Sequence, residues 1–394
     1  MFLEILLAIL LGVLAGCFTG LIPGVHVNLI ATLVSSSAAF LLEFISFFQV
    51  VGFIISLSIT HSFLSTIPSI FLGAPESGTS LGVLPGHAML IEGKGFEAVM
   101  LTILGSFFGL LFCFLLYPLL SFVLENSYDF VSNFMGELLL AIGFFLIVRS
   151  KMPILGLALY LFSGSLGYLA LNSEMSEPLF ALLSGLFGVS TLAVSLFENS
   201  KMPSQSLEDA DFNLANFSPF LALSSVAGFI TSVLPGLGSS AAAAIVSMIS
   251  PDSEKRSFLF MIGGITTSNF FCSIVALQII GKARNGSIVA LQSIGDAPVA
   301  LMLSSALISA GISFALAPYL IKFFCFITTK VNYVYLAGST IILLIALSFA
   351  FDGYIGFYTL FIAFLIGYVC ISFDMPRNIL MSCIMLPVAL FFIL

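Results

Sequence analysis

Runs of about twenty apolar residues follow one another along nearly the whole chain, and a helix of that length crosses a hydrocarbon core about 30 Å thick. Of the 394 residues, 60% are hydrophobic and 8% are charged, whereas a typical soluble domain carries about 25% charged residues. Within lipid, a single helix satisfies all of its own backbone hydrogen bonds. The sequence therefore predicts an all-α integral membrane protein, a multi-span helical bundle in the cell membrane.

Polar connections divide the chain into expected helical runs. These are 2–22, 25–46, 47–73, 96–124, 130–149, 154–171, 178–197, 217–234, 237–249, 257–281, 288–326, 333–351, 354–373 and 378–394. The first run carries Glu4 where a signal peptide has basic residues, so we expect a retained helix. The run 237–249 covers only about 20 Å as a helix, and the charged cluster after it must reach water. These features predict a re-entrant hairpin, which enters and leaves the membrane on one side.

A nearly identical phrase occurs in each half of the chain, as Gly20-Leu-Ile-Pro-Gly-Val25 and Ser232-Val-Leu-Pro-Gly-Leu237. Proline lacks an N–H donor and glycine relaxes the backbone, so both phrases interrupt apolar helices. Broken backbone at membrane depth is tolerated only where protein or a water-filled cavity satisfies it. A paired interruption of this kind is a sequence pointer to a transport site.

A second correspondence supports duplication, because Gly73–Thr79 corresponds to Gly281–Ser287 in the second half, and each segment follows the Pro-Gly phrase of its half. The polar stretch 198–216 is the natural linker between the halves. We therefore expect two inverted transmembrane repeats with re-entrant hairpins, at 1–197 and 217–394. The basic residues are spread over many loops and leave the sidedness of the termini open.

The two glycine loops read Gly-x-x-x-x-Gly-Thr and Gly-x-x-x-x-Gly-Ser. Such loops allow backbone N–H groups to face a carboxylate or phosphate closely. Glu76 and Arg284 occupy near-equivalent positions. Arg284 is suited to grip an anion and Glu76 to take a proton, although a structural Glu–Arg pair is an equal alternative.

All three histidines, His26, His61 and His87, lie in or near these motifs. An ionisable group at membrane depth is a functional hypothesis by default. The alternatives are that His87 is solvated on a loop and that His61 hydrogen-bonds a neighbouring helix. The histidines lack metal-ligand spacing, so we expect no metal site.

The predicted substrate site combines the hairpin tips with the glycine loops. Its residues are Pro23, Gly24, His26, Asn28, Gly73, Glu76, Ser77, Gly78, Thr79, Pro235, Gly236, Gly238, Ser239, Asn269, Arg284, Asn285, Gly286 and Ser287. Coupling to a cation, proton or sodium, is expected at Glu76, His61 and His87. The sequence has no hydrolase elbow, zinc-protease motif or dinucleotide fingerprint, so we expect neither an enzyme nor a cofactor.

Several segments resemble the large permease subunit of tripartite tricarboxylate transporters. They are Gly73–Thr79, Gly86–Met89, Gly93–Ala98, Gly105–Gly109 and Gly228–Gly238. The resemblance implies a carrier of di- or tricarboxylates that is driven by a cation gradient. It also implies an external binding protein and a small membrane subunit as partners. The chain is short for this family and Gly263–Asn269 lacks the acidic residue usual before the asparagine, so it looks more like the shorter archaeal branch.

A second hypothesis belongs to another class, since polyprenyl-phosphate translocases resemble this architecture. Their ligand is a lipid phosphate, which needs an opening towards the bilayer lipids. A membrane scaffold without transport is disfavoured because it leaves the broken helices without a purpose. The net charge of −8 argues against nucleic acid. The glycine faces around Gly105 and Gly109 fit packing within the protomer or in a homo-oligomer.

Overall fold

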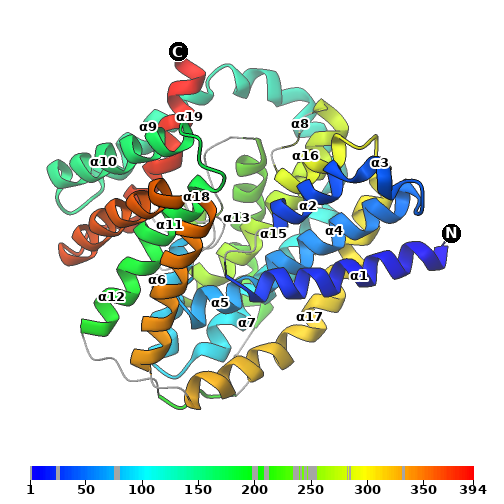
Figure 1. Ribbon diagram of the computed structural model, residues 1–394. Coiled ribbons are helices and arrows are strands. Elements are labelled where there is room, and N and C mark those ends of the chain that lie inside the picture. Colours follow the sequence, from blue (N-terminus) through cyan, green and yellow to red (C-terminus); the bar gives the residue numbers. More distant parts are fainter. Residues whose placement is uncertain are drawn as a thin grey trace.

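The described part of the chain is built of helices (Figure 1). The computed structural model describes residues 2–23, 27–74, 80–197, 203–207, 213–233, 239, 242–243, 246, 255–281, 283, 285–330 and 333–394. Within these ranges, nine helical segments are long and apolar enough to cross a membrane. This confirms the prediction of an all-α, multi-pass membrane protein.

The helices of the first half are α1 (Phe2–Leu21), α2 (Val27–Ser36), α3 (Ala38–Leu41), α4 (Phe47–Leu64), α5 (Thr66–Phe71), η1 (Ser80–Gly82), α6 (Val83–Ile91), α7 (Gly95–Leu115), α8 (Tyr117–Ser132), α9 (Met135–Val148), α10 (Pro153–Leu171), α11 (Pro178–Leu183), the π-helix η2 (Ser184–Val189) and α12 (Ser190–Phe197). Those of the second half are α13 (Leu214–Val233), α15 (Lys255–Ile280), α16 (Gly286–Gln292), α17 (Val299–Lys330), α18 (Tyr333–Ser372), η3 (Arg377–Met381) and α19 (Ser382–Ile393).

Proline and glycine explain where the long runs break. The expected run 96–124 is divided between α7 and α8, with Pro118 in the first turn of α8, where a missing N–H does no harm. The gap expected between 351 and 354 is confirmed inside α18, since Gly353 has φ 58° and ψ −141° and bends the helix. Only glycine adopts such a conformation without strain.

Helices α1 and α4 lie side by side and run in the same direction. A Cβ placed on Gly12 would lie 2.5 Å from the carbonyl oxygen of Phe53, and one on Gly20 would lie 3.1 Å from the Cβ of Leu64. Glycine thus permits the two backbones to approach closely. Because both helices advance together, the chain between them must return to the level from which α1 started. Helices α2 and α3 make this return, as a re-entrant hairpin requires.

The second half repeats this arrangement with α13 and α15. The rings of Phe217 and Phe260 are 4.9 Å apart near the start of both helices, and Thr231 contacts Asn269 further along both. Helices α13 and α15 are therefore parallel, as α1 and α4 are.

Contacts between the halves show that the repeats are inverted. Helix α7 runs parallel to α15, with an ion pair from Glu97 to Arg256 at their starts and a Phe114–Phe271 ring contact near the end of α7. Helix α17 runs opposite to α7, because Lys322 lies over the ring of Phe96 while Phe314 stacks on Phe107.

The same helix α17 is parallel to α4 and α5. Its Ser313 hydroxyl lies 2.9 Å from that of Thr60, and the rings of Phe324 and Phe71 are 5.9 Å apart. Helix α15 is parallel to α7, and α4 is parallel to α17, which runs opposite to α7. Helices α4 and α15 therefore point in opposite directions. The parallel pair α1–α4 is thus the inverted counterpart of the parallel pair α13–α15.

The glycine face of α7 packs within the protomer. A Cβ on Gly105 would lie 1.9 Å from the carbonyl oxygen of Phe260, and one on Gly109 would lie 2.9 Å from the Cα of Gly264. The Oγ1 of Thr267 also donates to the carbonyl of Ser106 over 2.8 Å. These contacts show that this face is used to join the two halves of one chain.

A peripheral bundle, formed by α9 to α12, η2, α18, η3 and α19, lies to one side of the molecule and away from α1, α4 and α16 (Figure 1). It meets the rest of the protein at the first glycine loop. A Cβ on Gly73 would lie 2.8 Å from a methyl carbon of Leu192, and the Oγ of Ser80 lies 3.8 Å from the sulfur of Met381. Gly73 and Ser80, which flank the residues outside the described part, thus both contact the peripheral bundle.

The described part of the predicted linker is attached to the turn between α6 and α7. The backbone N–H of Gly95 donates to the side chain of Gln205 over 2.8 Å, and Gln205 donates to the carbonyl of Leu90 over 3.0 Å. Lys255 and Glu92 form an exposed ion pair near the same turn. We expect this polar end of the bundle to lie at one membrane surface, because charged groups are unfavourable in the hydrocarbon core.

Candidate functional site

Two matched pairs of polar side chains occupy the ends of α1 and α13. We call Thr19 with His61 the first half-site and Thr231 with Asn269 the second half-site. The Nδ1 of His61 lies 3.0 Å from the Oγ1 of Thr19, and the Nδ2 of Asn269 lies 2.9 Å from the Oγ1 of Thr231. Each threonine stands four residues before the proline of its Pro-Gly phrase. The half-sites therefore lie where each hairpin helix ends.

The hydrogen bonds follow the same chemical order in both half-sites. The hydroxyl of Thr19 donates to the carbonyl of Gly16 over 3.3 Å, and that of Thr231 donates to the carbonyl of Gly228 over 3.0 Å. The Thr231 oxygen accepts from Nδ2 of Asn269. In the first pair, the tautomer of His61 decides whether Nδ1 or the Thr19 hydroxyl donates.

Close helix packing brings these groups together. A Cβ on Gly16 would lie 2.6 Å from the Cβ of Thr60, and a Cβ on Gly228 would lie 2.4 Å from the Cβ of Ser268. Both glycines allow the two helices to approach closely enough for side chains on the next turn to form a hydrogen bond between the helices. His61 is only 3% exposed and Asn269 is partly buried. Both lie near the centres of apolar spans, Phe47–Phe71 and Lys255–Ile280.

The two glycine loops start with the same backbone geometry. Gly73 ends α5 with φ 64° and Gly281 ends α15 with φ 65°. This left-handed conformation is open to glycine and stops a helix without strain. Each half thus has a glycine turn twelve residues after its half-site residue, His61 or Asn269.

Three predicted residues of the second loop form a helix start. Asn285 caps α16, since its side-chain oxygen accepts from the N–H of Ser287 over 3.0 Å and from its hydroxyl over 2.6 Å. Gly286 is the first residue of α16. These contacts give Asn285 and Ser287 a clear structural role in shaping the loop.

A polar cavity of about 280 Å³ opens beside Gly281. Gln278, Gln292 and Asp296 contribute to its lining, and Gln292 donates to the carbonyl of Gly281 over 3.1 Å. The carboxylate of Asp296 repels anions, so this cavity is not assigned to the substrate.

Other predicted site residues lie apart from the half-sites or outside the described residues. Pro23 follows α1, Asn28 lies in α2, and Ser239 is buried. Outside the described residues are Gly24, His26, Glu76, Ser77, Gly78, Thr79, Pro235, Gly236, Gly238 and Arg284. The proposed opposition of Glu76 and Arg284 therefore stays a prediction.

His87 is buried on α6 and is not solvated. Its Nδ1 lies 3.1 Å from the carbonyl of Ile70, to which it donates. Burial lowers the pKa of His87 from its ordinary value of 6.5, and the hydrogen bond to Ile70 opposes this only in part. The folded protein thus favours the neutral ring.

Acidification is expected to destabilise the protein through His87. The unfolded chain binds the proton more readily than the folded one, so stability is present above the ordinary pKa and is lost as pH falls below it. A thermal melt in detergent at about pH 7.5 and about pH 5 measures this loss. His87→Asn keeps a donor near Nδ1 and should show a smaller loss. Equal losses in both proteins would exclude His87 as the cause.

Arg377 is a buried cation that the sequence analysis treated as one loop charge among many. It is 8% exposed, and its guanidinium donates to the carbonyls of Leu186 and Phe187, to Ser190 and to Thr191. Leu186 and Phe187 belong to the π-helix η2, and their carbonyls also accept hydrogen bonds from the hydroxyls of Ser190 and Thr191. Arg377 thus completes the hydrogen bonding of η2.

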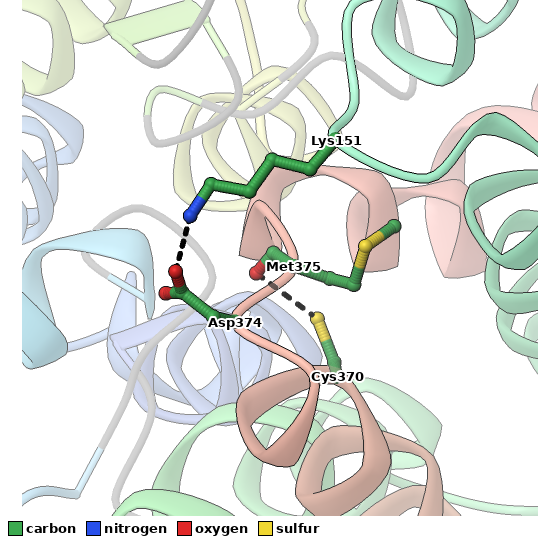
Figure 2. A network of polar contacts seen from close by, with 4 residues as sticks. All are labelled: Lys151, Cys370, Asp374 and Met375. Carbon is green, nitrogen blue, oxygen red and sulfur yellow. Dashed lines mark hydrogen bonds and ion pairs between the residues drawn. The ribbon is translucent and has the colours of Figure 1, made fainter.

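Arg377 follows a turn after α18, in which Asp374 and Met375 lie (Figure 2). Asp374 adopts φ 50°, and the N–H of Met375 donates to the carbonyl of Cys370, an arrangement that caps the helix end. Lys151 forms an ion pair with Asp374, and the Cys370 thiol lies 3.5 Å from the carbonyl oxygen of Met375. The guanidinium of Arg377 donates to the hydroxyl of Thr191. The next residue, Leu192, packs against Gly73. Arg377 therefore supports α12, the helix that packs against Gly73.

Two inverted halves, each with a helix that ends at a polar half-site inside the membrane bundle, define a protein of the transporter class. The chain matches the model of the tripartite tricarboxylate transporter TctA family over residues 6–382. This chain belongs to that family. Transporters of the family are tripartite, with a binding protein and a small membrane subunit beside the large permease.

An archaeal relative shares most of the chain. The uncharacterized protein MJ1079 of Methanocaldococcus jannaschii is 30% identical over 354 residues, which cover 87% of this chain and 88% of the relative. No solved structure matches the chain. The family and this relative agree with the expected archaeal-type branch of the permease.

Proposed function

We propose that this protein is the permease of a secondary-active transporter for small organic anions such as di- and tricarboxylates. The observation that carries the proposal is the pair of half-sites, which repeat the same hydrogen-bond order in two inverted halves. Inverted halves provide two related conformations, one open to each side of the membrane. A site at the centre of the spans can then face either side in turn.

The anion would bind between the two hairpin ends and the glycine loops. The Thr19 and Thr231 hydroxyls lie just before the Pro-Gly phrases. The glycine loops that begin at Gly73 and Gly281 would offer backbone N–H groups to a carboxylate. Arg284 would supply the charge that matches it. The chemistry of these groups favours a small multivalent carboxylate over an apolar solute.

Partners would supply the substrate from outside. A binding protein and a small membrane subunit accompany permeases of this family, and we propose the same assembly here. Proteoliposomes that contain the permease alone would show whether these partners are required, because unaided citrate exchange would remove them from the basic transport step.

Ligand-induced thermal stabilisation tests the proposed function. A ligand at about 100 times its Kd stabilises the folded state by about 2.7 kcal/mol. We expect citrate, succinate or tartrate to raise the melting temperature of the purified protein, and a polyprenyl phosphate to leave it unchanged. A shift with the lipid phosphate alone would replace this function by lipid translocation.

Thr231→Val tests the site with a matched control. Removal of the Thr231 hydroxyl disrupts the second half-site, so the stabilisation by the carboxylate should be lost or strongly reduced. Thr340→Val makes the same change at another buried threonine, whose hydroxyl donates to the carbonyl of Leu336 within α18. Equal ligand responses in the two variants would place the substrate elsewhere.

A further inference from the structure

We propose that the polar cavity beside Gly281 binds an alkali metal cation, and that this cation is coupled to the binding of the anion. The binding step stands on the cavity alone, whereas the coupling step rests on the proposed function. The cavity has a volume of about 280 Å³ and lies where α15 and α16 end and α17 begins. It has room for a cation with part of its hydration shell, since one water takes up about 30 Å³ in the liquid.

Three side chains of the cavity have oxygens available for a cation. Within the described part of the chain, the carboxylate of Asp296 and the amide of Gln278 form no hydrogen bond or ion pair. The amide of Gln292 donates to the carbonyl of Gly281 over 3.1 Å, a bond that uses its nitrogen and leaves its oxygen. Carboxylate, amide and water oxygens are the ligands that hard cations prefer.

Two helix ends add to the negative potential of the cavity. Helix α15 ends at Ile280 and α16 ends at Gln292, and both ends border the cavity. The last carbonyls of a helix have no partner within it and carry the negative end of its dipole, so they favour a cation. In transporters built from inverted repeats, carbonyls at such helix ends coordinate the coupling ion.

The charge of the lining fits a monovalent ion. Among the described residues that line the cavity, Asp296 alone is acidic and none is basic. One alkali cation neutralises this carboxylate, whereas a divalent ion would leave a net positive charge. Sodium and potassium share this chemistry, and the experiment below distinguishes them.

The cavity also lies where a bound ion can act on the substrate loop and on the first half. Gly281 belongs to its lining and begins the second glycine loop. The hydroxyl of Ser293 lies 2.6 Å from that of Ser35 on α2, and a Cβ on Gly295 would lie 3.4 Å from the ring of Phe47 at the start of α4. A cation here would attract a carboxylate to the loop and hold the segment between α16 and α17 in place against the first half.

Thermal stabilisation in the absence of any carboxylate tests the binding step. Sodium chloride or potassium chloride replaces choline chloride at constant ionic strength, so that screening does not change. We expect one or both of these cations to raise the melting temperature of the wild type in a saturable manner. The ion with the lower midpoint concentration is then the preferred one. No saturable rise with either ion, or a rise with magnesium alone, would overturn the inference.

Asp296→Asn removes the charge and keeps the size of the side chain. It should raise the midpoint cation concentration by about tenfold or more, as expected for a weakened metal site. Asp374→Asn is the matched control, because it makes the same change at an exposed carboxylate that pairs with Lys151. This control should keep the wild-type midpoint. An unchanged midpoint in Asp296→Asn would place the cation elsewhere and overturn the inference.

A second variant decides the case in which Asp296→Asn does not fold. Gln278→Met removes an amide that forms no hydrogen bond within the described part of the chain, so the fold should tolerate it. Its midpoint cation concentration should rise several-fold, because one oxygen ligand is lost. A wild-type midpoint in this variant would contradict the assignment of the cavity.

Melts with citrate separate this inference from the proposed function. Because linkage between two ligands is reciprocal, the saturating cation should lower the citrate midpoint by about fivefold or more, and citrate should lower the cation midpoint by the same factor. Citrate stabilisation that is independent of both cations would refute the coupling and leave the proposed function standing. Stabilisation by the cation without any response to citrate, succinate or tartrate would support the cation site and contradict the proposed function.

Discussion

Gly105→Ala is expected to destabilise the folded protein by about 3 kcal/mol or more, because the added methyl group overpacks the contact between α7 and α15. The new Cβ would lie 1.9 Å from the carbonyl oxygen of Phe260 and 2.8 Å from its carbonyl carbon. Both atoms belong to the backbone, so no side chain can turn away to make room. The two helices would have to separate, which also weakens the bond from Thr267 to Ser106.

Thermal unfolding in detergent measures this effect, with the folded fraction followed by size-exclusion chromatography. Gly311→Ala on α17 is the control, since a Cβ there would have no atom within 4 Å. Alanine favours a helix over glycine by about 1 kcal/mol, so this variant should be neutral or slightly more stable. Equal melting temperatures for Gly105→Ala and the wild type would refute the close packing.

Arg377→Met is expected to lower stability by a similar amount. It removes the hydrogen bonds from the guanidinium to the carbonyls of Leu186 and Phe187 and to the hydroxyls of Ser190 and Thr191, which keep only the bonds from these hydroxyls to these carbonyls. A hydrogen bond to a charged group contributes about 1.5–3 kcal/mol, and several are lost at once. Removal of a buried charge offsets part of this cost, so we expect a net loss of about 3 kcal/mol.

Arg377→Lys should recover only part of the stability, because a single ammonium group cannot reach acceptors that a planar guanidinium serves together. Lys151→Met on the neighbouring turn is the matched control. Lys151 and Asp374 form an exposed pair, whose loss should change stability by less than about 1 kcal/mol. Similar losses for Arg377→Met and Lys151→Met would show that the carbonyls of η2 do not depend on Arg377.

The sequence predicted the membrane fold and the duplication because both predictions depend on patterns of nearby residues. Apolar run length identifies spans, and the Pro-Gly phrases and glycine turns recur in register. The matched left-handed conformations of Gly73 and Gly281 agree with the loop correspondence. The inversion needed contacts between helices, since the scattered basic residues carried no clear orientation signal.

The half-sites were predicted only in part. His61 and Asn269 were named, but their threonine partners were not, because a hydrogen bond across helices depends on how closely the backbones approach. A signal was present, since Gly16-x-x-Thr19 and Gly228-x-x-Thr231 both precede a proline at the same distance. Arg377 was missed for another reason. The π-helix that needs it arises from tertiary packing and leaves no recognisable sequence pattern.

The joining of the halves also sets an order of events during biosynthesis. Helices α4 and α7 leave the ribosome long before α15 and α17, so Thr60 enters the bilayer before Ser313 exists, and Gly105 before Phe260. In the newly made first half, small-residue grooves and polar side chains are therefore exposed to lipid until the helices of the second half are inserted. Insertion factors must shield these surfaces throughout that interval, and a polypeptide that stops near the linker is a natural target for membrane quality control.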